Sequence, residues 1–418
     1  MKSKLILVLI CFLTVQVHSQ DWSQWRGPNR DGVISASEVP KEWPEKLERV
    51  WQIEVGEGHS SPVISDNKIF VFSRQNEEEV ITCVNPTNGK TIWQQSYPVP
   101  YTMHPAAYGH GKGPKSTPIA RQNAVITLGI GGILSCYNTE NGKLNWQNKF
   151  ADEFKSASPV YGAAMSPIIS DGLLIIHVGG HSDGALIAAE VLTGKVKWKW
   201  TGDGPSYASP MITTFAGTRQ VVNFSQEHII GIDFKTGELL WRVPFKTPWL
   251  VSCATPLLVD NDLILTGYDQ GMMRLKVDKK GETWSTEKVW EKPDFGNYMN
   301  TPVLFSDLVV TFADRNKGQY GILDAVTGEI YWRSKGRQGS NAALIRAGEL
   351  LLSLQTDGRF IISRPSKNGL EIVKEYTVAD SPTWAHPVIF DKKILIKDKT
   401  TLGLWSLEAR NEENKRKK

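Results

Sequence analysis

The sequence predicts an all-β fold, an eight-bladed β-propeller of four-stranded blades whose last blade is closed by an N-terminal strand. Three observations predict it: a turn motif that recurs along the chain, a proline-marked unit of nearly constant length, and short apolar runs without helical period. Repeated units of this kind bury their faces against their neighbours, so the whole mature chain is expected to be one domain.

The recurring motif is Asn or Thr, then Gly, then Lys or Glu, with a tryptophan four residues after the glycine. Glycine supplies the positive φ of a tight hairpin turn, so each copy is expected to join two strands. A tryptophan at a fixed place in each copy is best explained as an anchor that packs between blades, because its ring buries a large apolar area. The five anchors are Trp93, Trp146, Trp198, Trp241 and Trp332.

A second marker, a small polar residue followed by proline, opens each unit. Successive prolines of the first six copies are 43 to 56 residues apart, close to the period of a four-stranded propeller blade. A degenerate copy near Ala342 brings the number of units to eight. The seven clear copies begin at Ser61, Thr117, Ser166, Ser209, Thr255, Thr301 and His386.

The chain begins with an expected signal peptide, residues 1–19. Lys2 and Lys4 precede an apolar run that is too short and wrongly flanked for a membrane span. Cys11 lies inside this run and not after a small residue at its end, so there is no lipobox. We therefore expect an exported protein, periplasmic or extracellular, with no transmembrane segment.

The remaining chain divides into three parts. Residues 20–45 are rich in aromatic and turn-forming residues without a period, and we expect them to wrap the outside of the body. Residues 46–408 are the propeller. Its first strand, 49–55, resembles the tryptophan-bearing last strand of a repeat, and the last unit lacks such a strand, so the two are expected to complete one blade and remove free sheet edges. Residues 409–418 are predicted to be a disordered basic tail.

Composition excludes several kinds of function. The formal net charge is +4, and the dense basic cluster lies in the tail at 415–418, so no groove for nucleic acid is predicted. Three of the four cysteines remain after signal removal, an odd number that argues against a disulfide framework. No cysteine or histidine spacing indicates a metal site.

The run Ala/Cys-x-Asn/Asp-x-x-Thr/Asn-Gly-Lys/Glu-x-x-Trp resembles the tryptophan-docking motif of pyrroloquinoline quinone (PQQ) propeller repeats. The resemblance covers nearly the whole mature chain. It implies a PQQ-like propeller similar to the BamB-type outer-membrane assembly propeller, a scaffold without cofactor, and more distantly to quinoprotein alcohol dehydrogenases. The vicinal cysteines and calcium ligands of those enzymes have no counterparts here, so no catalytic residue is assigned, and the fold alone does not decide the function.

Candidate ligand-binding residues lie on two kinds of loop. Loops between blades and loops between the middle strands of a blade share one face around the channel of a propeller, and a concave face of this kind is where ligands usually bind. Rings with polar tips and charged side chains suit a binding mouth. The candidates are Tyr101, His104, Tyr108, His110, Tyr161, His181, Asp183, Tyr207, His228, Trp249, Asp269, Tyr298, Asp314, Arg315, Trp384 and His386.

Two functions follow from this face. The first is a non-catalytic, monomeric binding or scaffold protein, without a cofactor, that presents the aromatic face to an envelope or extracellular protein or to a small ligand. The alternative is a small quinoprotein-like oxidoreductase that binds PQQ with a divalent cation such as calcium and uses Asp183, Asp269 or Asp314 as base. A purely structural interpretation, in which the rings only fill the channel, is also open.

Overall fold

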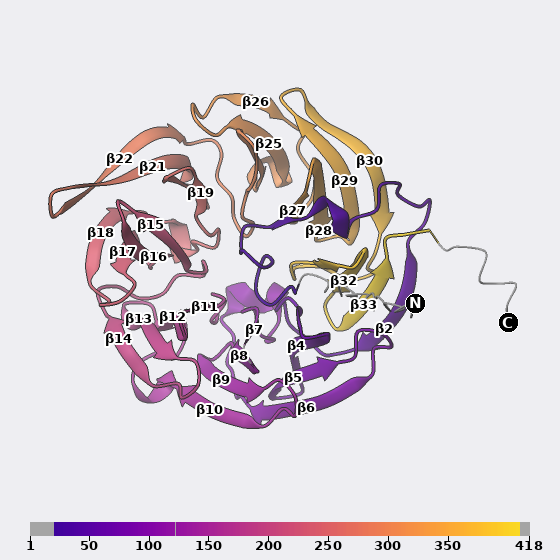
Figure 1. Ribbon diagram of the computed structural model, residues 1–418, viewed down its shortest axis with the longest axis horizontal. Helices are drawn as coiled ribbons and strands as arrows, with labels where there is room; N and C mark the ends of the chain where they lie inside the picture. Colours follow the sequence, from indigo (N-terminus) through magenta and orange to yellow (C-terminus); the bar gives the residue numbers. More distant parts are fainter. Residues whose placement is uncertain (1–20, 122, 410–418) are drawn as a thin grey trace, which may run out of the picture.

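The computed structural model describes residues 21–121 and 123–409. It confirms the predicted fold: eight four-stranded blades stand in a ring around a central channel (Figure 1). The predicted signal peptide and the part of the predicted tail beyond residue 409 lie outside the described residues.

Each blade is an antiparallel sheet whose strands follow in chain order from the channel outward. The first four blades are β3 (Val63–Ser65), β4 (Lys68–Gln75), β5 (Glu78–Val84) and β6 (Thr91–Pro98); β7 (Ile119–Arg121), β8 (Ala124–Leu128), β9 (Ile133–Asn138) and β10 (Leu144–Lys149); β11 (Ile168–Ser170), β12 (Leu173–Gly180), β13 (Asp183–Glu190) and β14 (Val196–Trp200); β15 (Met211–Phe215), β16 (Thr218–Phe224), β17 (His228–Asp233) and β18 (Leu239–Pro244).

The other blades follow the same plan, with one strand from the N-terminal region added to each of the last two. They are β19 (Leu257–Val259), β20 (Asp262–Gly267), β21 (Gly271–Lys280) and β22 (Thr283–Lys292); β23 (Val303–Phe305), β24 (Leu308–Ala313), β25 (Gln319–Asp324) and β26 (Ile330–Arg333); β27 (Ala342–Ala347), β28 (Leu350–Gln355), β29 (Arg359–Ser366) and β30 (Gly369–Thr377), with β1 (Val33–Ile34); β31 (Val388–Phe390), β32 (Lys393–Lys397) and β33 (Thr401–Ser406), with β2 (Glu48–Glu54).

The predicted closure of the ring is confirmed. Strand β2 pairs antiparallel with β33 and forms the outermost strand of blade 8, with Trp51 opposite Leu404. The ring is therefore held by backbone hydrogen bonds between two segments about 350 positions apart in the sequence.

The core lies between neighbouring blades, because the middle strands are buried on both faces. Strand β12, for example, is buried from Leu174 to Gly180 and packs against strands of blades 2 and 3 in a single cluster. Strands that are covered on both faces have continuous apolar sequences, as predicted from the short apolar runs.

The repeated turn and tryptophan join consecutive blades. The ring of Trp146 in blade 2 covers Gly194 of blade 3, where an added Cβ would lie 2.6 Å from the ring, and its Nε1 donates to the carbonyl of Val191 at 2.8 Å. Trp93 and Trp198 make the same contacts with the next blade. A register shift directly before each of these tryptophans turns its ring toward that blade.

Two anchors depart from this pattern. Trp241 packs against blade 5 but donates to Gln220 of its own blade, since the turn of blade 5 lacks the motif. Trp332 lies against Gly369 of blade 7. Trp51 and Trp290 make the regular contact and were not among the five predicted anchors. The glycine of the long hairpin β21–β22 lies nine residues before Trp290, so the spacing there is lost.

The N-terminal segment differs from the expectation that it wraps the outside. Residues 22–34 enter the channel instead, where the indigo trace crosses the ring in Figure 1, and β1 pairs in parallel with the innermost strand β27. Inner strands have no neighbour on the channel side, so their carbonyls need donors, and the buried guanidinium groups of Arg26 and Arg30 supply them. Only the following residues reach the outside, where the ring of Trp43 contacts Tyr376.

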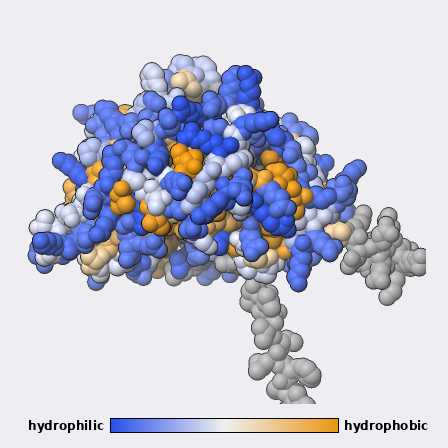
Figure 2. Space-filling model, turned by 90° about the horizontal axis from the view of Figure 1, so that it is seen from above, coloured by the Kyte–Doolittle hydropathy of each residue, from blue (hydrophilic) through white to orange (hydrophobic). Residues whose placement is uncertain are grey.

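Helices are few and short in the described chain: η1 (Ala36–Glu38), η2 (Pro105–His110), η3 (Phe150–Asp152), η4 (Pro248–Leu250) and η5 (Arg315–Lys317). None of them has the length or apolar character that crossing a bilayer requires. The edge of the ring is mostly hydrophilic, with small, separate hydrophobic areas (Figure 2).

Candidate functional site

The opening residues of the blades stand in a ring around the channel, and those of seven blades are joined in series by hydrogen bonds. In blade 8 and in blades 1 to 5, the backbone N–H of the residue that precedes the proline donates to the hydroxyl of its counterpart in the next blade. Thr117 donates to Ser166 and Ser166 to Ser209, both at 2.9 Å. The series runs from His386 through Ser61 as far as Thr301. A short hydroxyl side chain before proline is therefore a link between blades, which explains the predicted marker.

A cavity of about 770 Å³ lies inside this ring, on the face that carries the loops between blades. All eight blades contribute to its wall. Trp25 and Arg26 of the N-terminal segment also line it, because that segment occupies the channel. Arg26 Nη2 donates to the carbonyl of Pro302 at 2.9 Å, which fixes the segment in the channel. The volume is in the range of small-molecule sites.

The wall has a regular origin in the sequence. The residue two places before each opening serine, threonine or histidine points into the cavity, whereas the residue between them is turned away and buried in most blades. This is the alternation of an extended chain. The inward positions are His59, Lys115, Ala164, Tyr207, Cys253, Met299 and Trp384. Lys115 is the charged residue of this set.

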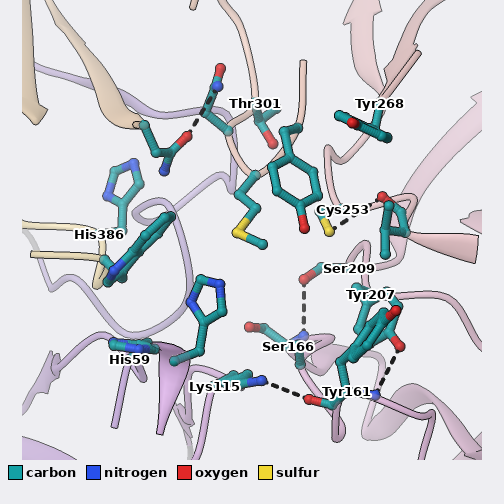
Figure 3. A pocket seen from close by; sticks show the side chains of 18 of the residues that line it. His59, Lys115, Tyr161, Ser166, Tyr207, Ser209, Cys253, Tyr268, Thr301 and His386 are labelled. Carbon is teal, nitrogen blue, oxygen red and sulfur yellow. Dashed lines mark hydrogen bonds between the residues drawn. The ribbon is translucent and has the colours of Figure 1, made fainter. Parts of the chain in front are cut away.

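Aromatic side chains stand in two groups across the cavity (Figure 3). On one side the ring of His110 lies edge-on to Trp384 at 4.8 Å between centroids, and His59 is 6.1 Å from the same indole. On the other side Tyr161 and Tyr207 stack at 6.0 Å, and the Tyr207 hydroxyl lies 3.3 Å from His181 Nε2. Such walls present flat apolar faces to whatever enters.

Lys115 extends between the two groups, and its Nζ donates to the carbonyl of Tyr161 at 2.6 Å (Figure 3). Burial lowers the pKa of Lys115 to about 8, so the amine is mostly protonated at pH 7. Among the described residues no carboxylate lies within 4.0 Å of this nitrogen, and the cavity wall contains no aspartate or glutamate. The charge of Lys115 is therefore unpaired.

Four histidines of the wall, His59, His110, His181 and His386, are mostly neutral near pH 7. Burial lowers the pKa of His59 to about 3 and that of His386 to about 3, the nearby charge of Arg26 adding to the effect at His386. Burial also lowers the pKa values of His110 and His181. His59 Nε2, His181 Nδ1 and His386 Nε2 are buried without a hydrogen-bond partner among the described residues.

Nine of the sixteen predicted site residues line this cavity. They come from six different inter-blade loops and one loop between middle strands, and the ring of blades brings them together. They are His104, His110, Tyr161, His181, Tyr207, Trp249, Tyr298, Trp384 and His386.

The other predicted aromatic and histidine residues lie outside it. Tyr101 stands behind the wall, with its hydroxyl close to Gly162, and Tyr108 on η2 is 64% exposed. His228 Nδ1 is 3.1 Å from Asp203 Oδ2, beside a separate, smaller hollow of about 350 Å³.

The predicted charged residues are also placed elsewhere. Asp183 lines the smaller hollow and accepts from the Lys155 N–H at 2.6 Å. Arg315 is paired with Asp294 at 2.6 Å. Burial raises the pKa of Asp314, and the negative charge of nearby Asp269 raises it further. Loops between middle strands lie farther from the axis than inter-blade loops, so most of their charged side chains do not reach the cavity.

Sequence reasoning missed Trp25, Arg26, His59, Lys115 and Tyr268 as wall residues. His59 and Lys115 could have been found from their place three residues before a blade-opening proline. Cys253 occupies the same place in its blade. Its thiol is free, and burial raises its pKa to about 12.

The cavity does not fit a calcium–quinone centre. Calcium is bound by several oxygen ligands, mainly carboxylates. The wall offers none, and the described residues contain no group of three or more His, Cys, Asp or Glu side chains placed to hold a metal ion. Asp183, Asp269 and Asp314, the bases considered for a quinoprotein, do not line it.

Comparison with known proteins identifies the family. The family described as outer membrane protein assembly factor BamB matches residues 76–334, more than half of the chain. The chain belongs to the BamB family. BamB of Shewanella oneidensis is 24% identical over 306 residues, which cover 70% of this chain and 75% of that protein. The predicted resemblance is thereby confirmed.

Solved structures agree on the fold of the BamB family. BamB from Moraxella catarrhalis superimposes with a TM-score of 0.63 at 14% identity, over 86% of this chain and 99% of that one. A europium-containing methanol dehydrogenase gives the same TM-score at 12% identity, over 90% of this chain and 89% of that one. At such identities the likeness shows a shared propeller and nothing about ligands.

Proposed function

We propose that this BamB-family chain is an exported, non-catalytic binding or scaffold propeller of the cell envelope. It holds its ligand or partner in the cavity of the top face, which is the face that carries the loops between blades. The observation that carries the proposal is the character of the wall: rings and hydrogen-bond donors converge from all eight blades, and no carboxylate stands among them. Binding needs such a wall, whereas the quinoprotein chemistry considered as alternative needs metal ligands and a carboxylate base.

The form of the mouth supports the same proposal. Trp249 is 76% exposed at its rim, and both Trp249 and Leu250 have positive φ values, 59° and 58°. Two consecutive non-glycine residues in this conformation are strained, and strain of this kind gathers at binding sites. An exposed indole at a cavity rim is suited to close over a bound group.

Site-specific photo-crosslinking tests where partners bind. A photoreactive residue at Trp249 should crosslink to defined envelope components in cells that express the protein, and one at Ser306, in the exposed turn between β23 and β24 on the opposite face, should not. Crosslinks from Ser306 and none from Trp249 would contradict the proposal, because they would place the partner on the face opposite the cavity.

A second assay tests the absence of catalysis. The purified protein should show no dye-linked alcohol or aldose dehydrogenase activity with added PQQ and calcium. Turnover under these conditions would overturn the non-catalytic assignment in favour of the oxidoreductase.

A further inference from the structure

We infer that the top-face cavity is a metal-independent site for small aromatic anions, in which the ligand's acidic group pairs with Lys115 and its ring lies between the two aromatic walls. This inference rests on the proposed binding function and names the class of ligand. The charges are reversed relative to a calcium site: here a protein cation would bind an anionic ligand, whereas in a calcium site protein carboxylates bind a cation.

The charge balance of the cavity is the first step of the argument. Lys115 and Arg26 are the lysine and arginine of the wall, and no acidic residue faces them there. Arg26 is already engaged with the Pro302 carbonyl and is buried behind Trp25. Among the residues that the structure describes, Lys115 makes one hydrogen bond, to the carbonyl of Tyr161, and an ammonium group has three donors. A buried cation without a counter-charge is costly, and an anionic ligand removes that cost.

The hydrogen-bonding character of the wall is the second step. Imidazole, phenol, hydroxyl and ammonium groups can donate, and the buried Nε2 of His59 has no partner among the described residues. A neutral sugar brings many hydroxyl donors and is normally met by carboxylate acceptors, which this wall does not contain. Acceptor-rich acids such as carboxylates and sulfonates match it better.

The arrangement of rings is the third step. His110, Trp384 and His59 form the wall on one side of Lys115. Tyr161 belongs to the opposite wall, and its backbone carbonyl accepts the hydrogen bond from the Lys115 amine. An acid at Lys115 would therefore place the body of the ligand between flat faces. Stacking on such faces raises affinity roughly 2- to 10-fold for each aromatic pair.

A matched pair of fluorescent probes tests this. 1-Anilinonaphthalene-8-sulfonate and N-phenyl-1-naphthylamine share the same ring system, and only the first is an anion. Titrated into the folded protein with EDTA present, the sulfonate should bind about 10- to 100-fold more tightly than the neutral amine, the gain of one charge-assisted pairing. Added calcium should leave its affinity unchanged.

Variants assign the effect to one side chain. Lys115→Met should reduce the preference for the anion to about onefold, and Lys115→Arg should retain it. Lys112→Met is the control, because Lys112 lies in the same loop but is 41% exposed and paired with Glu77; it should bind like the wild type. Circular dichroism melting identifies any variant that does not fold, and Lys115→Gln, with the same expected loss of preference, then takes the place of Lys115→Met.

Three results would overturn the inference. These are equal affinity for the two probes, an anion preference that survives Lys115→Met, or failure of both probes to bind. Dependence on calcium would contradict the metal-independent part. None of these results bears on the crosslinking or dehydrogenase assays, so failure of this inference is distinguishable from failure of the proposed function.

Discussion

Arg30 Nη1 donates a hydrogen bond to the carbonyl oxygen of Pro167 at 2.7 Å, across 137 positions of the sequence. Its other terminal nitrogen reaches the carbonyls of Ser166 and Pro210, so one guanidinium joins the N-terminal segment to blades 3 and 4. The side chain is 6% exposed. The planar fork of arginine suits this role, because it presents several donors in fixed directions.

Replacing Arg30 should therefore loosen the channel. Arg30→Met leaves three buried carbonyls without their donor, and we expect the free energy of unfolding to fall by about 2–4 kcal/mol. Urea denaturation measures this, with Arg364→Met as control, since Arg364 is 51% exposed in a surface ion pair and should change stability by about 0.5 kcal/mol or less. A loss of the same small size at Arg30 would show that the segment does not stabilise the ring.

Two glycines separate backbone strain from blade packing. Gly194 and Gly217 have φ values of +70° and +76°, but a Cβ at Gly194 would lie 2.6 Å from the Trp146 ring, whereas one at Gly217 meets nothing within 4 Å. Gly217→Ala should cost about 1 kcal/mol, the strain alone. Gly194→Ala should cost a further 1–3 kcal/mol of overpacking. Equal losses would mean that the ring of Trp146 moves aside freely.

The protein should lose stability in mild acid. Burial lowers the pKa of His177 to about 4, and those of His59 and His386 to about 3. Between pH 6.5 and about 4 the unfolded chain binds these protons and the folded protein does not, so the free energy of unfolding falls as the pH is lowered. Each histidine contributes up to about 1.4 kcal/mol per pH unit.

Denaturation at pH 7, 6 and 5 measures that slope. His177→Gln should lower stability at pH 7, because the hydrogen bond with Asn223 is changed, and should reduce the slope by about one proton. An unchanged slope in this variant would exclude His177 from the acid response.

Binding of an aromatic anion should weaken in base. The pKa of Lys115, lowered by burial to about 8, places its loss of charge between pH 7 and 9. The groups that act on it stay uncharged over this range, since burial lowers the pKa of His59 and of His110 and raises the pKa of the Cys253 thiol to about 12. Affinity for the naphthalene sulfonate should fall by up to about tenfold per pH unit above the pKa of the complex. A flat profile up to pH 10 would assign the pairing to Arg26.

Trp249 should matter for binding and not for folding. Its indole is 76% exposed and its backbone is strained, so Trp249→Ala should change the free energy of unfolding by about 0.5 kcal/mol or less while lowering probe affinity several-fold. Trp384→Ala is the contrasting variant, since this ring packs against His110. If Trp249→Ala destabilised the protein as much as Trp384→Ala, the indole would be part of the packing and not of the mouth.

The sequence predicted what is encoded locally. Glycine and tryptophan four positions apart define a turn and an anchor within one hairpin, so Trp146 and Trp198 could be recognised without knowledge of the rest of the chain. Where the hairpin is longer, as before Trp290, the same packing leaves no fixed spacing. The pairing of β2 with β33 is not local, but it was predicted because the first strand carries the tryptophan that the last unit lacks.

The site was predicted less completely, because its members meet across blades. Aromatic residues on the inter-blade loops could be identified by type, and Tyr207 and Trp384 are examples. Lys115 resembles any surface lysine until the other blades enclose it. Arg26 and Arg30 bind backbone carbonyls, which carry no residue identity, so their partners at Pro302 and Pro167 leave no pattern in the sequence.

The pairing of β2 with β33 also sets an order of assembly. Residues 48–54 leave the ribosome about 350 positions ahead of their partners at 401–406. Until then Trp51 and its neighbours expose an unpaired strand, and the sheet they belong to cannot form. Contacts so distant along a chain make folding slow. The nascent chain thus carries an open β edge while all the intervening blades are made, and a chaperone that covers such edges would raise the yield of the closed ring.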